Sequence, residues 1–430
     1  MFKKHLHKIL FSLFFLVIAI PVVIYKFDIA DRFKLEGAYT TIAKPEFTFG
    51  KYFNEKFQSE YDKYWNSEFG FRGFFVRLHN QLLFSVFNKS MVYGVEVGKD
   101  NYLYETQYID AFYGKDFIGE PSIDDRCNKL KIISDSLSKH GCEVLVVLTP
   151  GKGSFYPEYI SDYHKHSGNP TNYETYVNYF KKYGIDFVDY NSWLISLKQT
   201  SKYPLFPKTG IHWSYYGMTL VADSLIKYIE KKLNKDIPEM IIDSIEVKKE
   251  CENTDDDIEN AMNLHFPIKK PLMAYSRFHF NSENKFKPRT LVISDSFYWS
   301  FYDSGISNGI FRNNRFMYYY KEVYPEHFSQ ATYASDINIK DELDSTDLII
   351  IMTNEPNLNN LGFGFIDEIL TMFNSYDVYL KNKRINEIKS EMIKSPEWME
   401  VLYKKAYDKK MTIEEVMEMD AVWMYENETK

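Results

Sequence analysis

Cysteine is scarce in this chain, and its scarcity excludes several kinds of site. The 430 residues include only three cysteines, Cys127, Cys142 and Cys251. Their separations lack the short spacing of zinc ligands, and an odd number of thiols can form at most one disulfide bond within the chain. We therefore predict no bound metal and no cofactor.

Clusters of basic residues are missing as well. The formal net charge is −8, with 52 Lys and Arg against 60 Asp and Glu. A protein that neutralises nucleic-acid phosphates needs a basic face, so we expect no nucleic-acid partner. The sequence also lacks internal repeats and linkers rich in Pro or Gly, and its 45% hydrophobic residues indicate a globular chain rather than a disordered one.

Aromatic residues, by contrast, are abundant, with 35 Tyr and 34 Phe. We interpret most of them as core packing, because large aromatic side chains bury much apolar surface. The alternative is that tyrosines above a cleft stack on sugar rings.

The N-terminus combines positive charge with a long apolar run. Lys3, Lys4 and Lys8 precede residues 9–25, which are almost all apolar. About 20 such residues cross a bilayer as a helix, and positive charge before the run keeps the N-terminus in the cytoplasm. No small-x-small cleavage site follows, which favours an uncleaved signal anchor over a removed signal peptide. We predict a transmembrane anchor over residues 1–26, with the rest of the chain extracytoplasmic, either periplasmic or at the cell surface.

The remaining chain divides into three parts. Residues 27–90 mix charged and aromatic residues at near-helical spacing and predict a helical neck. Residues 91–375 form the main domain, which opens with a hairpin whose turn is GKDN at residues 98–101. Residues 376–430 predict a charged, helical C-terminal tail, with helix starts at Ser395 and Thr412.

The main domain shows the alternation of an α/β fold. Continuous apolar strands followed by polar loops are typical of a doubly wound parallel sheet covered by helices. We therefore predict a three-layer α/β/α, flavodoxin-like sheet whose polar groups emerge at one edge. The predicted strands are residues 143–148, 186–188, 290–294 and 347–352, and the predicted helices are residues 129–140, 172–183 and about 215–233.

Residues 234–289 interrupt this alternation. They contain an acidic cluster at residues 252–259 with few apolar residues, which predicts a solvated insertion. A calcium site at Asp255, Asp256 and Asp257 is disfavoured, because consecutive acids lack the alternating ligand spacing of a calcium loop.

Two segments carry the main chemical signal. TLVISDSFYW at residues 290–299 predicts a buried strand that ends just before Ser296, the position at which nucleophiles of open α/β sheets are found. A serine nucleophile needs a base. Among ten histidines, His212 has the clearest local context, because Trp213 and the N-cap-like Ser214 follow it. Together they indicate a Ser/His hydrolase or acyltransferase.

Four segments carry a resemblance to a known family. In chain order they are VYGVEVGKDNYLYE, VLVVLTPGKGSFYPEY, LFPKTGIHW and VISDSF. Over roughly residues 90–375, the chain resembles the alginate O-acetyltransferase-like branch of the SGNH hydrolase superfamily, in which the histidine segment likewise precedes the serine segment. The resemblance implies an SGNH hydrolase-like fold and action on a polysaccharide outside the cytoplasmic membrane, with a membrane-bound O-acyltransferase as a partner that exports acetyl groups.

By this resemblance, Ser296 is the nucleophile and His212 the base. The family's aspartate, two residues before the histidine, falls on Gly210, which cannot orient an imidazole. Loss of that carboxylate in a Ser/His/Asp site lowers turnover by about ten-thousand-fold. Three alternatives stay open: Asp189 or Asp186 replaces the acid, a Ser/His dyad works with a backbone carbonyl, or the site is inactive.

Other residues near the predicted strand ends are candidates for substrate contact. Asn354 is a candidate oxyanion donor, Lys152 a candidate ligand of an acidic sugar and Tyr302 a candidate cleft residue. Tyr302 reaches the cleft if a helical turn follows the nucleophile. Two of these residues have a simpler interpretation, namely a turn for Asn354 and a solvated loop residue for Lys152. Ser294 replaces a family glycine and narrows the approach to the nucleophile. Asp295 and Trp213 are interpreted as structural.

The sequence thus predicts a membrane-anchored protein that O-acetylates a surface or secreted polysaccharide through a Ser-His acyl-enzyme. One alternative is a polysaccharide O-acetyl esterase, in which water rather than a sugar hydroxyl resolves the acyl-enzyme. Another is a non-catalytic, carbohydrate-binding scaffold of a polysaccharide assembly complex, which Gly210 and Ser294 favour.

Overall fold

The computed structural model describes residues 2–26, 35–37, 42–68, 72–372 and 376–428. Its central element is a six-stranded sheet. The strands are β3 (Glu143–Thr149), β4 (Phe187–Asp189), β7 (Thr290–Ser294), β8 (Arg315–Tyr318), β9 (Glu322–Tyr324) and β10 (Leu348–Asn354). They lie in the order β4-β3-β10-β7-β8-β9, all parallel except β9, which is antiparallel to β8. The predicted α/β sheet is therefore present, and β8 and β9 are additions that the sequence did not reveal.

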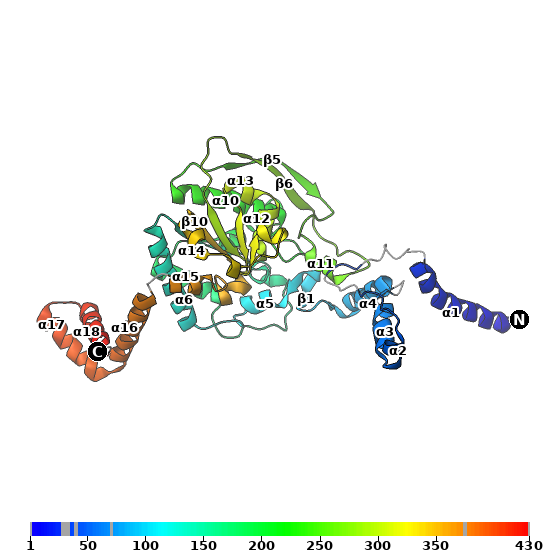
Figure 1. Cartoon of the computed structure of the whole chain (residues 1–430), viewed down its shortest axis with the longest axis horizontal. Coiled ribbons are helices and arrows are strands. Elements are labelled where there is room, and N and C mark those ends of the chain that lie inside the picture. Colours follow the sequence, from blue (N-terminus) through cyan, green and yellow to red (C-terminus); the bar gives the residue numbers. More distant parts are fainter. Residues whose placement is uncertain (1, 27–34, 38–41, 69–71, 373–375, 429–430) are drawn as a thin grey trace.

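Helices cover both faces of this sheet. One face carries α6 (Glu120–Ser138), α8 (Asn172–Tyr183) and α15 (Phe365–Met372). The other carries α9 (Tyr190–Leu197), α10 (Tyr215–Leu233), α12 (Trp299–Asp303) and α13 (Ile306–Ile310). The result is a three-layer α/β/α domain, as predicted (Figure 1).

The central strand β10 shows why the sheet is buried on both sides. All seven of its residues, LIIIMTN, are buried. Successive side chains of a strand point to opposite faces, so Ile350 and Met352 enter the core beneath α10, while Ile349 and Ile351 enter the core beneath α6 and α8. The apolar run Leu348–Met352 suits a strand that has helices on both sides.

The register of the sheet brings three strand ends to one edge. Asn354, the last residue of β10, pairs with Thr149, the last residue of β3. Ser294, the last residue of β7, pairs with Met352. The loops that leave β3, β7 and β10 are therefore neighbours, which is where open α/β sheets bind ligands.

The segment predicted as a solvated insertion is structured instead. It contains an antiparallel hairpin, β5 (Glu239–Lys248) with β6 (Met273–Asn281), and the short helix α11 (Asp257–Met262). Asp255 is 1% exposed and Glu259 is 7% exposed. Ile258 and Met262, one helical turn apart, pack into the main core and bring the acids before them inside, so the acidic cluster is less solvated than predicted, whereas most residues of β5 are exposed.

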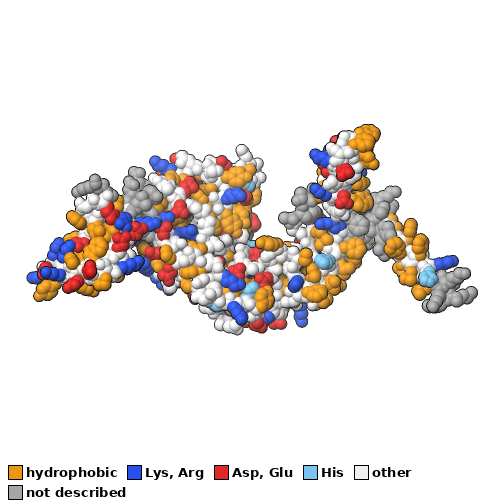
Figure 2. Space-filling model, turned by 90° about the horizontal axis from the view of Figure 1, so that it is seen from below, with side chains coloured by type: hydrophobic (Ala, Val, Ile, Leu, Met, Phe, Trp, Pro, Cys, Tyr) orange, Lys and Arg blue, Asp and Glu red, His pale blue; other side chains and the backbone are white. Residues whose placement is uncertain are grey.

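The N-terminal part is helical. It comprises α1 (Phe2–Lys26), α2 (Phe49–Phe53), α3 (Lys56–Glu68) and α4 (Arg72–Phe87), followed by the hairpin β1 (Val95–Val97) and β2 (Leu103–Glu105). Within the described residues, no helix is both long enough and apolar enough to cross a membrane. The predicted neck falls partly outside the described residues, at 27–34, 38–41 and 69–71. Exposed apolar side chains gather over these N-terminal helices (Figure 2).

The C-terminal tail forms three helices with their own small core. They are α16 (Tyr376–Lys394), α17 (Pro396–Lys409) and α18 (Ile413–Glu428). Ser395 caps α17 as predicted, and Thr412 caps α18 by accepting a hydrogen bond from the Glu415 amide at 3.2 Å. Residues 429–430 lie outside the described part. The three cysteines are free thiols.

Candidate active site

Ser296 begins a tight turn just after β7. Asp295 fixes this turn, because its carboxylate accepts hydrogen bonds from the backbone amides of Phe297 at 3.0 Å and Asn354 at 2.8 Å and from the side-chain amide of Asn357 at 3.1 Å. Burial raises the pKa of Asp295. Asp295 thus ties the end of β7 to the end of β10, the structural role expected for it, and holds Ser296 at the sheet edge.

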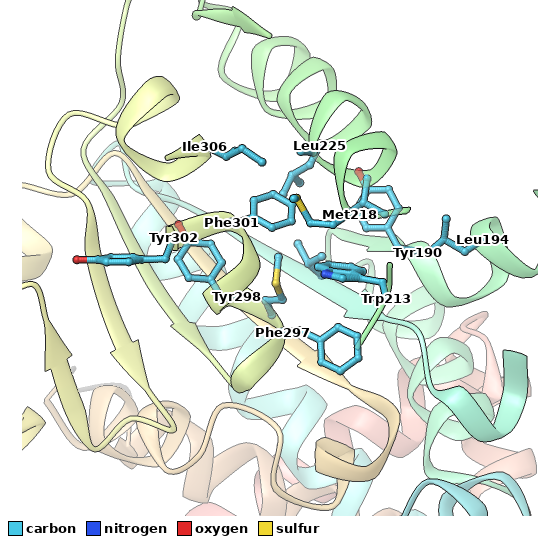
Figure 3. Close-up of a cluster of buried hydrophobic side chains, with 14 of the residues drawn as sticks. Tyr190, Leu194, Trp213, Met218, Leu225, Phe297, Tyr298, Phe301, Tyr302 and Ile306 are labelled. Carbon is cyan, nitrogen blue, oxygen red and sulfur yellow. The ribbon is translucent and has the colours of Figure 1, made fainter. Parts of the chain in front are cut away.

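His212 lies in the loop before α10. Ser214 caps that helix by accepting from the Gly217 amide at 2.9 Å, and its hydroxyl donates to the carbonyl of Pro204 at 2.7 Å. The Trp213 indole donates to Ser300 at 2.8 Å and packs on Phe297, as Figure 3 shows. The loop is therefore fastened on both sides of the histidine.

Three side chains form a continuous hydrogen-bonded chain. The Nε2 atom of His212 lies 2.9 Å from the Ser296 hydroxyl, and its Nδ1 atom lies 3.0 Å from Oδ2 of Asp257. A carboxylate can only accept, so Nδ1 carries the proton and Nε2 is left free to accept from Ser296. This is the arrangement of a Ser/His/Asp triad. The Ser296–His212 contact expected from the sequence is present.

Asp257 was not predicted as part of this chain. It is the first residue of α11, and its Oδ1 accepts from the Ile211 amide at 2.9 Å and the Ile258 amide at 2.7 Å. Gly210 makes room for it, because an added Cβ there would lie 2.5 Å from the Thr254 carbonyl oxygen. The backbone of the acidic segment therefore packs against Gly210, next to the carboxylate that Asp257 supplies.

The two aspartates proposed from the sequence lie elsewhere. Asp189 caps α9 by accepting from the Ser192 amide at 2.9 Å, and it also accepts from the Tyr173 hydroxyl at 2.7 Å. Asp186 forms an ion pair with Lys232 at 2.6 Å. Neither contacts His212, so their prediction as the orienting acid is wrong. Asp186 precedes the edge strand β4 and Asp189 ends it. Strands β3 and β10 separate β4 from β7, the strand that leads to Ser296.

Lys152 is not a solvated or sugar-binding residue. It is fully buried in α7 (Lys152–Phe155), and its ammonium donates to the carbonyls of Lys208 at 3.0 Å and Gly210 at 2.5 Å. Burial lowers its pKa to about 7, while Asp257 and Glu105 act in the opposite direction. Lys152 therefore supports the histidine loop from below.

Tyr302 also lies away from the site. It is on α12, packed against Trp299 and Phe316, and Figure 3 shows it at the far side of the aromatic cluster from Trp213. It lines neither cavity at Ser296. Ser294 is fully buried and also lines neither cavity. The prediction that it narrows the approach to the nucleophile is therefore wrong.

Asn354 does lie near Ser296. Its Oδ1 caps the 3₁₀ helix η7 (Glu355–Asn360) by accepting from Asn357 at 3.2 Å, and its Nδ2 donates to the Tyr108 hydroxyl at 2.9 Å. An amide nitrogen has two hydrogens, so one remains for another acceptor. The turn interpretation and the donor interpretation of Asn354 are thus compatible.

Tyr319 is a neighbour of Ser296 for which the sequence offered no signal. It follows β8 with φ +52°, a left-handed conformation that is unusual for a large side chain and that clusters at functional sites. Its amide donates to the Ser294 carbonyl at 2.8 Å. Burial raises the pKa of its hydroxyl to about 12.

Two cavities meet at Ser296 and His212. The larger measures about 590 Å³ and is also lined by Trp213, Tyr215, Asp255 and Trp299. The smaller measures about 370 Å³ and is also lined by Tyr108, Asp257, Tyr319 and Asn354. The nucleophile is thus reached from two sides.

Comparisons with known proteins show what this chain is similar to. The family model described as "SGNH hydrolase-like domain, acetyltransferase AlgX" matches residues 95–263, a segment that includes His212 and Asp257. This part of the chain therefore resembles the SGNH hydrolase-like domain of AlgX/AlgJ-type proteins. Ser296 lies beyond the matched segment, and its hydroxyl donates to Nε2 of His212 within that segment.

Two relatives of this chain are named probable alginate O-acetylases. The AlgJ protein of Pseudomonas syringae pv. tomato is 28% identical over 42% of this chain, and that of Pseudomonas aeruginosa is 24% identical over 43%. The chain spans 44% and 45% of the lengths of these relatives. The O-acetyltransferase domain of Pseudomonas putida AlgJ aligns with 65% of this chain and 99% of its own, with 14% identity and a TM-score of 0.42.

Proposed function

We propose that this protein is an O-acetyltransferase that acetylates hydroxyl groups of a polysaccharide. The observation that carries the proposal is the chain of hydrogen bonds from Ser296 through His212 to Asp257, at a sheet edge where two cavities meet. A nucleophile, a base and an orienting acid in this order are what acyl transfer through a covalent intermediate requires.

The first step forms the acetyl-enzyme. The Ser296 oxygen attacks the acetyl carbonyl carbon of a donor ester or thioester while Nε2 of His212 takes the hydroxyl proton. The imidazolium is stabilised by Asp257, which stays ionised. Collapse of the tetrahedral intermediate breaks the bond to the leaving group, which takes the proton from His212. The acetyl group is then bonded to Ser296.

The second step transfers the acetyl group. A sugar hydroxyl attacks the acetyl carbonyl, and its proton passes to Nε2 of His212 and then to the Ser296 oxygen as that bond breaks. In both steps the carbonyl oxygen gains negative charge and needs donors aimed at it. The Ser296 amide and the remaining Nδ2 hydrogen of Asn354 are the candidates, because Ser296 lines both cavities and Asn354 lines the smaller one.

A polysaccharide O-acetyl esterase uses the same first step, and water replaces the sugar hydroxyl in the second. The scaffold alternative loses the support that Gly210 and Ser294 gave it, because Asp257 supplies the missing carboxylate and Ser294 is buried outside both cavities. The relatives named alginate O-acetylases support transfer as the reaction.

We further propose that the domain works outside the cytoplasmic membrane. The support is the positively charged N-terminus followed by the apolar residues 9–25, which fits a signal anchor. A membrane-bound O-acyltransferase is the proposed source of acetyl groups on that side of the membrane, since cytoplasmic donors do not reach it unaided.

Turnover of an activated aryl acetate tests the catalytic part. Wild type should release the phenol, and Ser296→Ala and His212→Ala should each abolish release, with no further loss in the double variant because the two residues act as a unit. Adding an oligosaccharide acceptor should yield an O-acetyl sugar, whereas an esterase would yield acetate alone. Equal activity of wild type and Ser296→Ala would overturn the proposal.

A further inference from the structure

The two cavities at Ser296 differ in what surrounds them. The candidate oxyanion donor Asn354, together with Tyr108 and Tyr319, lines only the smaller one. The acetyl carbonyl oxygen must point toward such donors, so the acetyl group of the acyl-enzyme faces the smaller cavity. An incoming hydroxyl must reach the carbonyl carbon and His212 together, and the larger cavity leads to His212 from the other side. The larger cavity is therefore the place for the acceptor sugar.

The larger cavity has aromatic and acidic walls. Trp299 and Tyr215 are half-buried and line it, and aromatic faces of this kind suit sugar rings. Its acidic side chains are Glu252, Asp255 and Asp303, against one cation, Arg277.

The cation in this wall is already paired. Arg277 donates to Glu246 at 2.8 Å and lies 3.9 Å from Glu252. Lys152, the sequence-based candidate for contact with an acidic sugar, is buried, and its ammonium donates to backbone carbonyls. Among the described residues, no lysine, arginine or histidine forms an ion pair with Asp255 or Asp303. Burial raises the pKa of Asp255 to about 7 and also raises the pKa of Asp303, so the negative charge of these two acids grows as pH rises, and no ion pair in the described part of the chain balances it.

Asp255 adds a specific acceptor atom. The residue is 1% exposed, and its Oδ1 accepts from the Tyr215 amide at 3.3 Å. Its Oδ2 is buried and makes no geometrically sound hydrogen bond within the described part of the chain, although the Tyr275 hydroxyl is a neighbour. A carboxylate oxygen can accept more than one hydrogen bond, so Oδ2 can take a further donor beside the Tyr275 hydroxyl. A hydroxyl or amino group of a bound sugar is a donor of the right kind.

We propose that the larger cavity is the acceptor subsite and that it takes a glycan without acidic groups, a neutral or amino sugar whose hydroxyl or ammonium groups donate to Asp255. This rests on the proposed acetyl transfer. A uronate acceptor is disfavoured because its carboxylate would face Asp255 and Asp303 without a free cation. The chain then differs in acceptor from relatives that are named for alginate.

Competition between acceptors tests this inference. An aryl acetate serves as donor, and oligosaccharides of equal length serve as acceptors: a neutral gluco-oligosaccharide, a chitosan oligosaccharide and a mannuronate oligosaccharide. Mass spectrometry counts the O-acetyl groups on each. Neutral or amino acceptors should be modified at least about tenfold faster than the uronate, the discrimination expected when a buried polar group must be paired. Comparison of the gluco-oligosaccharide with the chitosan oligosaccharide shows whether a hydroxyl or an ammonium group donates to Asp255.

Two variants link the selectivity to the cavity. Asp303→Lys and Asp255→Asn should each raise the ratio of uronate to neutral product, and this ratio is measured within one variant so that a change in overall rate cancels. Asp135→Lys, an exposed position on α6, is the matched control for net charge and should leave the ratio unchanged. A preference of wild type for the uronate, or ratios that respond equally to all three changes, would overturn the inference.

Binding separates this inference from the proposed function. Calorimetry with Ser296→Ala, which cannot form an acetyl-enzyme, should show tighter binding of the neutral or amino oligosaccharide than of the uronate. If wild type releases no phenol from the aryl acetate but this binding order holds, acetyl transfer fails and the acceptor subsite stands. The reverse binding order removes the subsite whatever the activity.

Discussion

Replacing Asp257 by asparagine should nearly abolish turnover, and the structure gives the reason. Oδ1 of Asp257 accepts from two backbone amides, those of Ile211 and Ile258, whereas Oδ2 faces Nδ1 of His212. The asparagine oxygen must stay at the Oδ1 position to pair these amides. Its NH₂ group then points at Nδ1 and forces the imidazole proton onto Nε2.

The magnitude follows from that tautomer. With the proton on Nε2, His212 cannot accept from Ser296, and the equivalent change in a Ser/His/Asp protease lowers kcat by about 10⁴. A loss of that size corresponds to about 5 kcal/mol of transition-state stabilisation. Thermal stability should change little, because the side-chain shape and both backbone hydrogen bonds are kept.

Initial rates of aryl acetate hydrolysis measure this loss, with the melting temperature as a check on folding. Asp256→Asn is the matched control: its carboxylate pairs with Lys270 at 3.1 Å rather than with His212. Asp189→Asn is the second control, and both should stay within about twofold of wild type, the usual reach of a change that touches no reacting group. If Asp257→Asn loses no more than Asp256→Asn, or if Asp189→Asn shows the large loss, the assignment of Asp257 is refuted.

Four further predictions follow from the same geometry. Gly210→Asp should lower both activity and melting temperature rather than restore a family aspartate, because its Cβ would lie 2.5 Å and 2.8 Å from the backbone oxygens of Thr254 and Asp255; a gain in rate would contradict the packing seen there. Lys152→Met should lower kcat by about tenfold to a hundredfold with KM little changed, since it loosens the histidine loop, whereas a sugar-binding lysine would show a raised KM. Burial, followed by the neighbouring charges of Asp116 and Asp189, raises the pKa of Glu355 to about 7, whereas the same carboxyl in the unfolded chain ionises near its ordinary pKa of 4.5. Between these two values the native state keeps the proton that the unfolded state loses, so the free energy of unfolding should fall as pH rises from about 4.5 to about 7, by at most about 3 kcal/mol. Urea titrations of Glu355→Gln should show a flatter dependence of stability on pH. Finally, protease added to spheroplasts should digest the domain, while in untreated membranes the protein should resist a carbonate wash; full protection would rule out the extracytoplasmic anchor.

Local sequence signals were enough for some of the long elements, although α6 begins at Glu120, before its predicted start at residue 129. The strand Leu348–Asn354 and the helix Asn172–Tyr183 were predicted to within about two residues, since the first is an unbroken apolar run and the second has a capping box at Thr171 and a left-handed glycine at Gly184. The strand β8 was missed because it has four residues and ordinary loop residues around it.

Contacts between distant segments set the limit in the site. Ser296 and His212 were found because each follows a recognisable local segment at a strand end or before a helix. Asp257 was missed because its position depends on the packing of α11 into the core, and no local pattern in an acidic stretch predicts that packing. Lys152 was misjudged for the same reason, since the loop that buries it comes more than fifty residues later.

The most direct test of the central claim is to find the acetyl group on Ser296. Wild-type protein is mixed with the aryl acetate, quenched in acid within the first turnovers and digested, and the peptide that contains Ser296 is mapped by mass spectrometry. We expect one acetyl group on Ser296 in wild type, little in His212→Ala and in Asp257→Asn, and none on that peptide in Ser296→Ala. An acetyl group on another residue would contradict the assignment of Ser296 as the nucleophile. So would steady turnover by wild type with Ser296 unmodified, together with equal turnover by Ser296→Ala.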